Sequence, residues 1–268
     1  MSDKQVILIT GANQGLGLEV VKALYKSGGA YEIIVGSRSV DNAETAIASV
    51  KQEISTSKSN LNTLQIDISS DDSISQAFEH VGKQYGRVDV LINNAGANFD
   101  FAASQGKMTV REAFNASWDV NVAGTHVMTN EFIPILLKSS QPRLMFVTSG
   151  TSALTETENF DYPPLARLNA SPVAGWPKPA NTVISYRSSK TGLNMLMREW
   201  AKTLKNDGVK VFAISPGFLA TGLAGIGPEQ LKKVRTFHLY RKISANSSPD
   251  GRTRSLRRWK LYQRRRRG

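Results

Sequence analysis

The sequence contains no cysteine, which excludes disulfides, thiolate zinc sites and a cysteine nucleophile. Its three histidines are far apart, at His80, His126 and His238, so we expect no metal site. No apolar run is long enough to span a membrane, and residues 6–9 are too few for a signal peptide. The absence of cysteine also fits a reducing compartment. We therefore expect a soluble, cytoplasmic protein.

Acidic residues are almost missing from the C-terminal end. Residues 241–268 contain eleven Lys/Arg and one acid, Asp250, for a net charge of +10, which leaves +2 for the other 240 residues. This composition predicts one domain over residues 1–240 and a disordered basic tail over 241–268. The tail is interpreted as a solvated extension, as a contact to nucleic acid or acidic membrane, or as a cover over the sheet edge. The first interpretation is preferred, so a nucleic-acid partner is not expected.

Short apolar segments alternate with amphipathic ones along the chain. The predicted strands are 6–10, 33–36, 61–66, 88–92, 143–148 and 209–214. The predicted helices are 16–26, 41–55 with a cap at Asp41, 71–85, two between 110 and 138, and 185–205. Strands rich in Val, Ile and Leu without polar alternation indicate a parallel sheet buried on both faces. We therefore predict an α/β fold of the Rossmann type, a doubly wound parallel sheet with helices on both faces.

A glycine-rich turn lies between the first predicted strand and the first helix. Residues 10–17 read Thr-Gly-Ala-Asn-Gln-Gly-Leu-Gly, with glycines at Gly11, Gly15 and Gly17. Glycine allows the backbone to turn sharply and to approach a pyrophosphate closely. The N–H groups of the helix N-terminus favour an anion there. The pattern predicts a dinucleotide site, although an ordinary strand–helix turn would have the same composition.

The end of the second strand indicates which dinucleotide binds. An NAD site has a carboxylate there for the ribose 2′-hydroxyl. In this chain Arg38 follows the strand and no acid comes before Asp41. A guanidinium can bind a 2′-phosphate through two hydrogen bonds. We therefore predict NADP(H) as the cofactor.

Tyr186 and Lys190 lie four residues apart and hence on one face of a predicted helix. A free phenol is a poor base, and lowering its pKa to near 7 requires roughly 4 kcal/mol of stabilisation of the phenolate. A neighbouring ammonium acts in that direction, as does an oxidised nicotinamide. Ser149, at the end of the fifth strand, is placed to hydrogen-bond a substrate oxygen. Each feature alone is common in proteins without such a function.

Together these motifs resemble the short-chain dehydrogenase/reductase family, and within it the NADP-preferring members that are similar to carbonyl reductases. The resemblance runs from residue 4 to about 235 in order and approximate spacing. It is carried by the turn at 10–17, Asp67, Asn-Asn-Ala-Gly at 93–96, Asn121, Ser149, Tyr186 with Lys190, and Pro216-Gly217 followed by Leu219 and Thr221. A member of this family is an oxidoreductase.

The resemblance implies how the cofactor is held. Asp67 would contact the adenine and Asn94 the ribose side of the adenosine. Leu16 would lie against the pyrophosphate, and Leu219 and Thr221 would contact the nicotinamide carboxamide.

It also implies the chemistry. Tyr186 would be the acid or base, and Ser149 would orient the carbonyl. Lys190 would hold the nicotinamide ribose and lower the pKa of Tyr186. Asn121 would anchor a water molecule that relays protons to Lys190.

The chain departs from the family at two places. The segment 150–180 is longer than in most members, and it contains five prolines and the aromatic residues Phe160, Tyr162 and Trp176. We interpret it either as a lid around an aromatic-lined pocket or as a surface loop packed by its own aromatic rings. The family's seventh strand has no counterpart in 241–268, so we expect low stability or weak activity.

The sequence thus predicts an enzyme that interconverts a carbonyl compound and an alcohol with NADPH, acting on a small molecule of specialised metabolism. The rival hypothesis is a non-catalytic NADP-binding regulator whose basic tail contacts nucleic acid. The oligomeric state, monomer or homo-oligomer, stays open.

Overall fold

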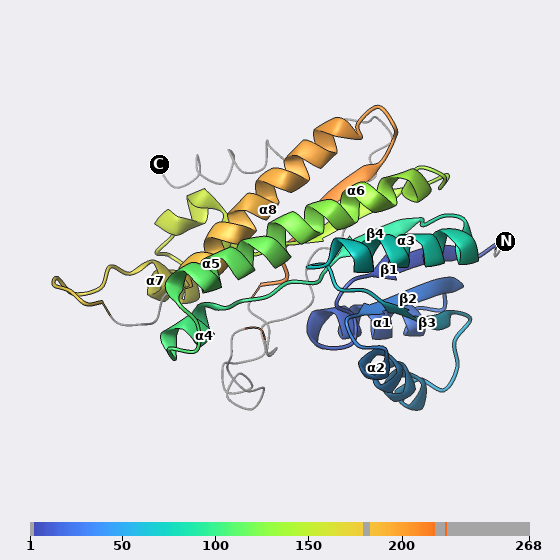
Figure 1. Cartoon of the computed structure of the whole chain (residues 1–268), viewed down its shortest axis with the longest axis horizontal. Helices are drawn as coiled ribbons and strands as arrows, with labels where there is room; N and C mark the ends of the chain where they lie inside the picture. The colour runs from blue at the N-terminus through green and yellow to red at the C-terminus, as the bar shows by residue number, and fades with distance from the viewer. Residues whose placement is uncertain (1–2, 179–182, 218–222, 224–268) are drawn as a thin grey trace, which may run out of the picture. The chain divides into compact units, whose positions relative to one another are not determined.

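A parallel sheet of six strands forms the centre of the computed structural model, which describes residues 3–178, 183–217 and 223 (Figure 1). The strands lie in the order β3-β2-β1-β4-β5-β6. Their bounds are β1 Gln5–Ile9, β2 Tyr31–Ser37, β3 Asn60–Gln65, β4 Val90–Asn93, β5 Arg143–Val147 and β6 Lys210–Ile214. Because the order reverses between β1 and β4, ligands are expected at the carboxyl ends of these two strands.

Helices cover both faces of this sheet. Their bounds are α1 Gly15–Lys26, α2 Val40–Glu53, α3 Asp71–Tyr85, α4 Asp100–Ser104, α5 Val110–Trp118, α6 Thr125–Leu136, α7 Pro163–Asn169 and α8 Ile184–Thr203. Helices α1 and α2 pack on one face, and α3, α6 and α8 pack on the other (Figure 1). The predicted doubly wound α/β fold is therefore confirmed.

The side chains of β1 show how the sheet builds two cores. Val6 and Leu8 belong to the core under α3, α6 and α8, while Ile7 and Ile9 belong to the core under α1 and α2. Successive strand residues point to opposite faces, so a strand buried on both sides must be apolar throughout. All four side chains are buried, as the continuous apolar run predicted.

The structure corrects several predicted elements. The second helix is not capped by Asp41: it begins at Val40, and the Ser39 hydroxyl accepts the Asn42 N–H at 3.2 Å. The two helices predicted between 110 and 138 are α5 and α6, joined by a π-helical turn at Asp119–Gly124. The long insertion contains α7, which was not predicted.

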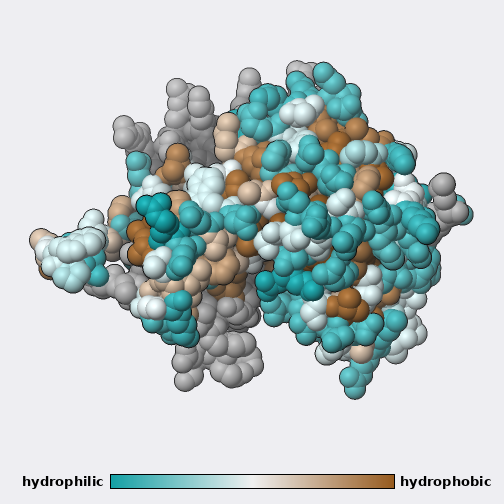
Figure 2. All heavy atoms as spheres, in the orientation of Figure 1, coloured by the Kyte–Doolittle hydropathy of each residue, from teal (hydrophilic) through white to brown (hydrophobic). Residues whose placement is uncertain are grey.

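Strand β6 lies at one edge of the described sheet, and the Phe212 side chain on it is 42% exposed. The predicted tail, 241–268, falls outside the described residues. Across the part of the chain that the structure describes, no helix combines the length and apolarity needed to cross a membrane. In the view of Figure 2, hydrophilic side chains cover much of the surface, and hydrophobic residues are gathered in patches between them.

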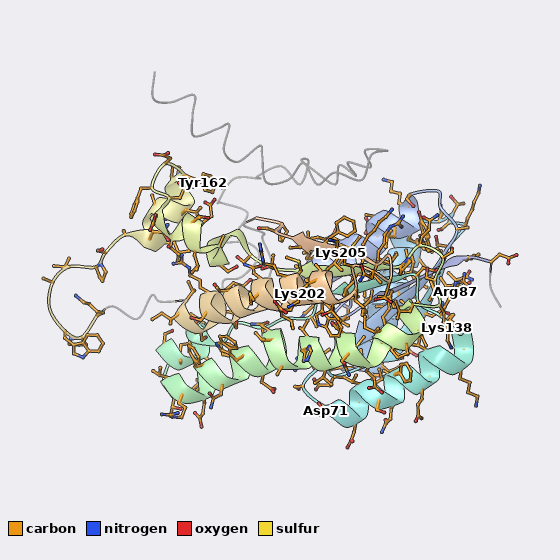
Figure 3. All side chains as sticks on the ribbon, turned by 90° about the horizontal axis from the view of Figure 1, so that it is seen from above. Asp71, Arg87, Lys138, Tyr162, Lys202 and Lys205 are labelled. Carbon is orange, nitrogen blue, oxygen red and sulfur yellow. The ribbon has the colours of Figure 1, made fainter. Side chains whose placement is uncertain are left out.

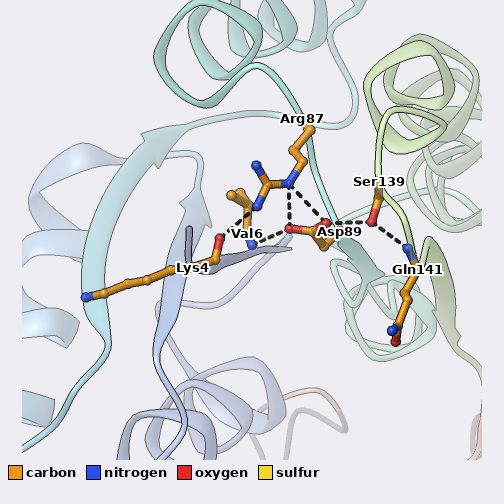
Figure 4. Close-up of polar contacts among 6 residues, drawn as sticks. All are labelled: Lys4, Val6, Arg87, Asp89, Ser139 and Gln141. Atoms are coloured by element: carbon orange, nitrogen blue, oxygen red, sulfur yellow. Dashed lines mark hydrogen bonds and ion pairs between the residues drawn. The ribbon is translucent and has the colours of Figure 1, made fainter. Parts of the chain in front are cut away.

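A buried carboxylate ties strands and loops together at the amino end of the sheet (Figure 4). Asp89 Oδ2 accepts the Val6 N–H at 2.7 Å, and Oδ1 accepts the Ser139 hydroxyl at 2.5 Å. The Arg87 guanidinium lies 3.2 Å from the carboxylate and also donates to the Lys4 carbonyl at 3.1 Å. In Figure 3, Arg87 lies at the opposite end of the described structure from Tyr162. The cluster lies at the amino ends of β1 and β4, away from the carboxyl ends where ligands are expected, so we infer that it serves stability.

Asp89→Asn tests this role. The amide cannot accept all the hydrogen bonds that the carboxylate accepts, and it removes the negative charge that lies 3.2 Å from the half-buried Arg87 guanidinium. We expect the free energy of unfolding to fall by about 2–3 kcal/mol, below the range for a fully buried pair because Arg87 reaches solvent. Urea denaturation checks this, with the exposed Glu79→Gln as the control. Equal stability of the two variants would contradict the assignment.

Candidate active site at the carboxyl ends of the strands

The glycine turn lies where β1 ends and α1 begins. Gly11 and Gly15 have positive φ angles of 61° and 56°. Gly17 is buried, and a Cβ there would lie 2.5 Å from the Gly11 carbonyl oxygen and 2.6 Å from Asn94 Nδ2. Only glycine allows so close an approach of backbone to backbone. Leu16, also predicted as a site residue, is half-buried beside them.

The side chain of Asn94 holds this turn against the end of β4. Its amide donates to the carbonyls of Thr10 at 2.8 Å and Gly11 at 3.0 Å. The Thr10 hydroxyl in turn accepts the N–H groups of Asn94 at 3.1 Å and Ala95 at 3.0 Å. Asn94 therefore shapes the turn, whatever contact it makes to a ribose.

The first turn of α1 fits an anion. Its N-cap, Gln14, makes no side-chain hydrogen bond to the helix, and the first turn contains no acidic residue. The first N–H groups of a helix have no partners within it, and they carry partial positive charge. A pyrophosphate in the glycine turn would meet these groups, so the residues present fit a dinucleotide, NAD(H) or NADP(H).

Arg38 and Asp67 follow β2 and β3, which are neighbouring strands. Arg38 is exposed, and its backbone carbonyl accepts Gln65 Nε2 at 3.4 Å. Burial acts to raise the pKa of Asp67, but hydrogen bonds from Ser69 and the charge of Arg38 outweigh it, and the pKa lies below its usual value. The structure thus places a guanidinium and a carboxylate within electrostatic reach of each other at this edge.

Lys190 is the most deeply buried charged side chain of the predicted site, at 3% exposure. Its Nζ donates to the Val147 carbonyl at 3.0 Å and lies 5.9 Å from the centroid of the Tyr186 ring. Burial lowers the pKa of Lys190 to about 8. The amine has space because Gly96 lacks a side chain: a Cβ there would lie 3.1 Å from Nζ.

Tyr186 and Ser149 come together although 37 positions separate them in the sequence. Burial raises the pKa of the Tyr186 phenol, and a hydrogen bond with Ser149 acts in the opposite direction. The Ser149 hydroxyl lies 2.8 Å from Thr151 Oγ1 and caps the short helical turn Gly150–Ser152. Because its pKa lies above the usual value, the phenol keeps its proton near neutral pH.

Asn121 is fully buried in the π-helical turn between α5 and α6. Its side chain pairs with the Ala97 backbone, accepting the N–H at 2.9 Å and donating to the carbonyl at 2.8 Å. It also donates to Ser189 Oγ at 3.0 Å. Such turns insert one residue into a helix and are frequent at functional sites. Asn121 thus joins the segment after β4 to α8, beside Lys190.

Asp100, which the sequence did not predict as a site residue, caps the helix that carries Tyr186. Its carboxylate accepts the N–H of Ser185 at 3.0 Å and that of Tyr186 at 2.9 Å, so it caps α8 from a different element. Local capping patterns cannot reveal it, because Asp100 lies 85 positions before Ser185, whose N–H it accepts. A negative charge at a helix N-terminus is favourable, and here it also fixes the backbone of the tyrosine.

Two predicted cofactor contacts, Leu219 and Thr221, lie outside the described residues. Of the other predicted site residues, Arg38 and Asp67 follow β2 and β3, and the rest lie on the turn after β1, at the ends of β4 and β5, in the π-helical turn and on α8. Within residues 3–178, 183–217 and 223, no three His, Asp or Glu side chains form a group that could hold a metal ion. The arrangement offers a phenol, a hydroxyl and an amine beside a turn that suits a pyrophosphate, which is suited to proton transfer at a carbonyl oxygen.

Comparison with known proteins shows which family the chain resembles. The family described as short chain dehydrogenase matches residues 5–163 and 168–230. The chain is 52% identical over 223 residues to the short-chain dehydrogenase/reductase eupG of Phoma sp, covering 82% of this chain and 79% of that protein. It is 42% identical over 224 residues to the short-chain dehydrogenase/reductase tropE of Talaromyces stipitatus, covering 83% of this chain and 81% of that protein.

Solved structures show the same fold. A metagenomic short-chain oxidoreductase in complex with NADP superposes with a TM-score of 0.59 at 25% identity, covering 86% of this chain and 87% of that one. A 3-oxoacyl-[acyl-carrier protein] reductase from Brucella melitensis, in complex with NAD, gives a TM-score of 0.64 at 21% identity, covering 87% of this chain and 80% of that one.

Gly17→Ala tests the turn. The added Cβ would displace the Gly11 carbonyl or the Asn94 amide, so we expect binding of a nicotinamide dinucleotide to weaken by at least about tenfold, which corresponds to 1.4 kcal/mol. Fluorescence titration with NADPH checks this, alongside a thermal melt to confirm folding. Gly82→Ala is the control, because a Cβ at that helical position meets nothing within 4 Å. Unchanged affinity in a folded Gly17→Ala protein would show that the nucleotide binds elsewhere.

Proposed function

Because the chain belongs to the short-chain dehydrogenase/reductase family and is thus an oxidoreductase, we propose that it uses NADPH to reduce a ketone or aldehyde, or catalyses the reverse oxidation. One observation carries this proposal: the Tyr186 phenol lies beside both the Ser149 hydroxyl and the Lys190 amine. These groups lie at the end of the sheet that holds the glycine turn.

The residues present would hold the cofactor in parts. The turn with Gly11, Gly15 and Gly17 would bind the pyrophosphate, and Lys190 would bind the nicotinamide ribose. When bound, the nicotinamide supplies or accepts the hydride.

Tyr186 moves the proton. During reduction the phenol gives its proton to the carbonyl oxygen, while the Ser149 hydroxyl donates a hydrogen bond that orients this oxygen. During oxidation the phenolate must form, and burial opposes it. The Lys190 ammonium, with a pKa of about 8, is charged near neutral pH and stabilises that phenolate. Asn121 would anchor a water molecule that returns protons to Lys190.

Arg38 supports NADP(H) over NAD(H). It follows β2, where a carboxylate would select the 2′-hydroxyl of NAD, and its side chain is exposed. The carboxylate within its electrostatic reach, Asp67, follows β3 and is assigned to the adenine. Of the two related structures described above, one was solved with NADP and the other with NAD, so the fold itself accepts both.

The long insertion at 150–180 favours a substrate that is bulky for a metabolite. We propose that this substrate is a compound of specialised metabolism. We also propose that residues 1–240 form one domain, that 241–268 form a basic tail, and that the protein acts in the cytoplasm.

Tyr186→Phe tests the assigned acid. The ring stays but the transferable proton is lost, so we expect turnover with NADPH and a panel of carbonyl compounds to fall by about 10²- to 10⁴-fold. The affinity for NADPH should stay within about twofold, which shows that the variant is folded. Tyr85→Phe, at the last residue of α3, removes a hydroxyl far from the site and is the control. Full activity of Tyr186→Phe would refute the mechanism.

Arg38→Ala tests the choice of cofactor. Loss of a charge-assisted contact to phosphate should weaken NADPH binding by about 10- to 100-fold and leave NADH binding nearly unchanged. Equilibrium titration with both nucleotides measures this, and the exposed Arg111→Ala on α5 is the matched control. If both nucleotides lose affinity equally, Arg38 does not read the 2′-phosphate.

A further inference from the structure

The insertion after β5 is held to α8 by polar contacts. Two aromatic rings of the insertion, interpreted above either as pocket lining or as its own packing, are exposed: Phe160 by 60% and Trp176 by 87%. One apolar anchor within α7, Leu165, is buried. The main polar contact instead comes from Arg187, the residue that directly follows Tyr186.

The Arg187 guanidinium binds two separated parts of the insertion. Its Nε donates to the Thr151 carbonyl at 2.8 Å, and its Nη2 donates to Asn169 Oδ1 at 3.0 Å. The side chain is half-buried, and burial lowers its pKa. The guanidinium stays charged, since its normal pKa lies far above neutral pH. Its planar fork can satisfy two acceptors in fixed directions, whereas an ammonium has no such geometry.

Asn169 extends this contact. Its Nδ2 donates to the Glu156 carbonyl at 2.7 Å and to the Asn159 carbonyl at 3.1 Å. Asn159 in turn accepts the Asp161 N–H at 3.1 Å. Two side chains, Arg187 and Asn169, therefore fix the start, middle and end of the stretch from 151 to 169.

The same helix face also holds the turn that begins with Ser149. Thr191, one helical turn beyond Arg187, donates from its hydroxyl to the Ser152 carbonyl at 2.7 Å. Arg187 and Thr191 thus bind consecutive carbonyls, those of Thr151 and Ser152. Tyr186 lies on the same helix. The positions of the insertion and of the Ser149 turn relative to Tyr186 are therefore all set by α8.

We propose that Arg187, together with Asn169, is a positioning residue that holds the 151–169 segment beside Tyr186 and Ser149 and thereby determines which carbonyl substrates fit. The proposal rests on the proposed function. It assigns the binding of large substrates to contacts with a segment that α8 holds in place. Large multi-ring ketones must contact that segment, whereas small ketones reach Tyr186 without it.

Two variants separate the contacts. Arg187→Lys keeps the charge but cannot bind both acceptors at once. Asn169→Asp keeps an acceptor for Arg187 but loses the donor to the Glu156 and Asn159 carbonyls. Arg198→Lys, at an exposed position of the same helix, is the matched control.

Amide hydrogen exchange tests the positioning without substrate. In α7, Leu165 and Ala166 donate their N–H groups to the Tyr162 carbonyl. We expect both variants to speed exchange in residues 154–169 by about tenfold or more, with no change in α1 or α6. Arg198→Lys should match the unmodified protein. If Arg187→Lys and Arg198→Lys exchange alike, the positioning role is wrong.

Steady-state kinetics tests the effect on selectivity at saturating NADPH. For a multi-ring ketone, KM should rise about tenfold in Arg187→Lys and Asn169→Asp, because the segment that contacts it is no longer fixed. The value of kcat should change less than about twofold, because Tyr186 and Lys190 keep their places and Thr191 still holds the turn that begins with Ser149. For a small ketone, KM and kcat of both variants should equal those of the unmodified protein. Equal losses for both ketones, or a fall in kcat alone, would overturn the selectivity role.

Failure of the proposed function would give a different experimental result from failure of the positioning role. If the unmodified protein turns over no carbonyl compound with NADPH, the proposed function fails, and the selectivity role fails with it. The exchange experiment then still decides whether Arg187 and Asn169 fix the segment, because it needs neither cofactor nor substrate.

Discussion

The site depends on one constraint, the burial of the Lys190 amine next to the Tyr186 ring. Taking an ammonium out of water is unfavourable, and the lowered pKa of Lys190 reflects that cost. The Val147 carbonyl offsets part of it, at 3.0 Å, and Gly96 leaves the space that the amine occupies. The end of β5, the segment after β4 and helix α8 must therefore all be in place before the phenol has a charged neighbour.

Helix α8, which carries Tyr186 and Lys190, also contacts the other parts of the site. Asp100 fixes its first N–H groups from another element, and Asn121 reaches Ser189 from the π-helical turn. Further along, Arg187 and Thr191 hold the loop that carries Ser149. Every one of these contacts joins parts of the chain at least 36 positions apart, so the geometry of the site is a property of the assembled fold.

This explains how much the sequence could predict. Local patterns, such as the continuous apolar strand 6–9, the glycine turn, and Tyr186 four residues before Lys190, were enough to predict the fold. They also named candidate site residues, whose roles stay predictions. Asp100 and Arg187 escaped prediction because their partners are distant, and nothing near Asp100 in the sequence marks it as the cap of α8. The insertion was interpreted through its aromatic rings, yet the described structure holds it through Arg187 and Asn169. Leu219 and Thr221 lie outside the described residues and stay predictions.

The central claim, that Lys190 acts on the phenol through its charge, is tested most directly by the pH dependence of kcat/KM for alcohol oxidation. That direction needs the phenolate, so kcat/KM should rise with pH as Tyr186 loses its proton. In Lys190→Met the phenol loses its positive neighbour and its pKa rises, so we expect the rise in kcat/KM to occur at higher pH than in the unmodified protein. A rise at the same pH in both proteins would contradict the claim that Lys190 acts through its charge.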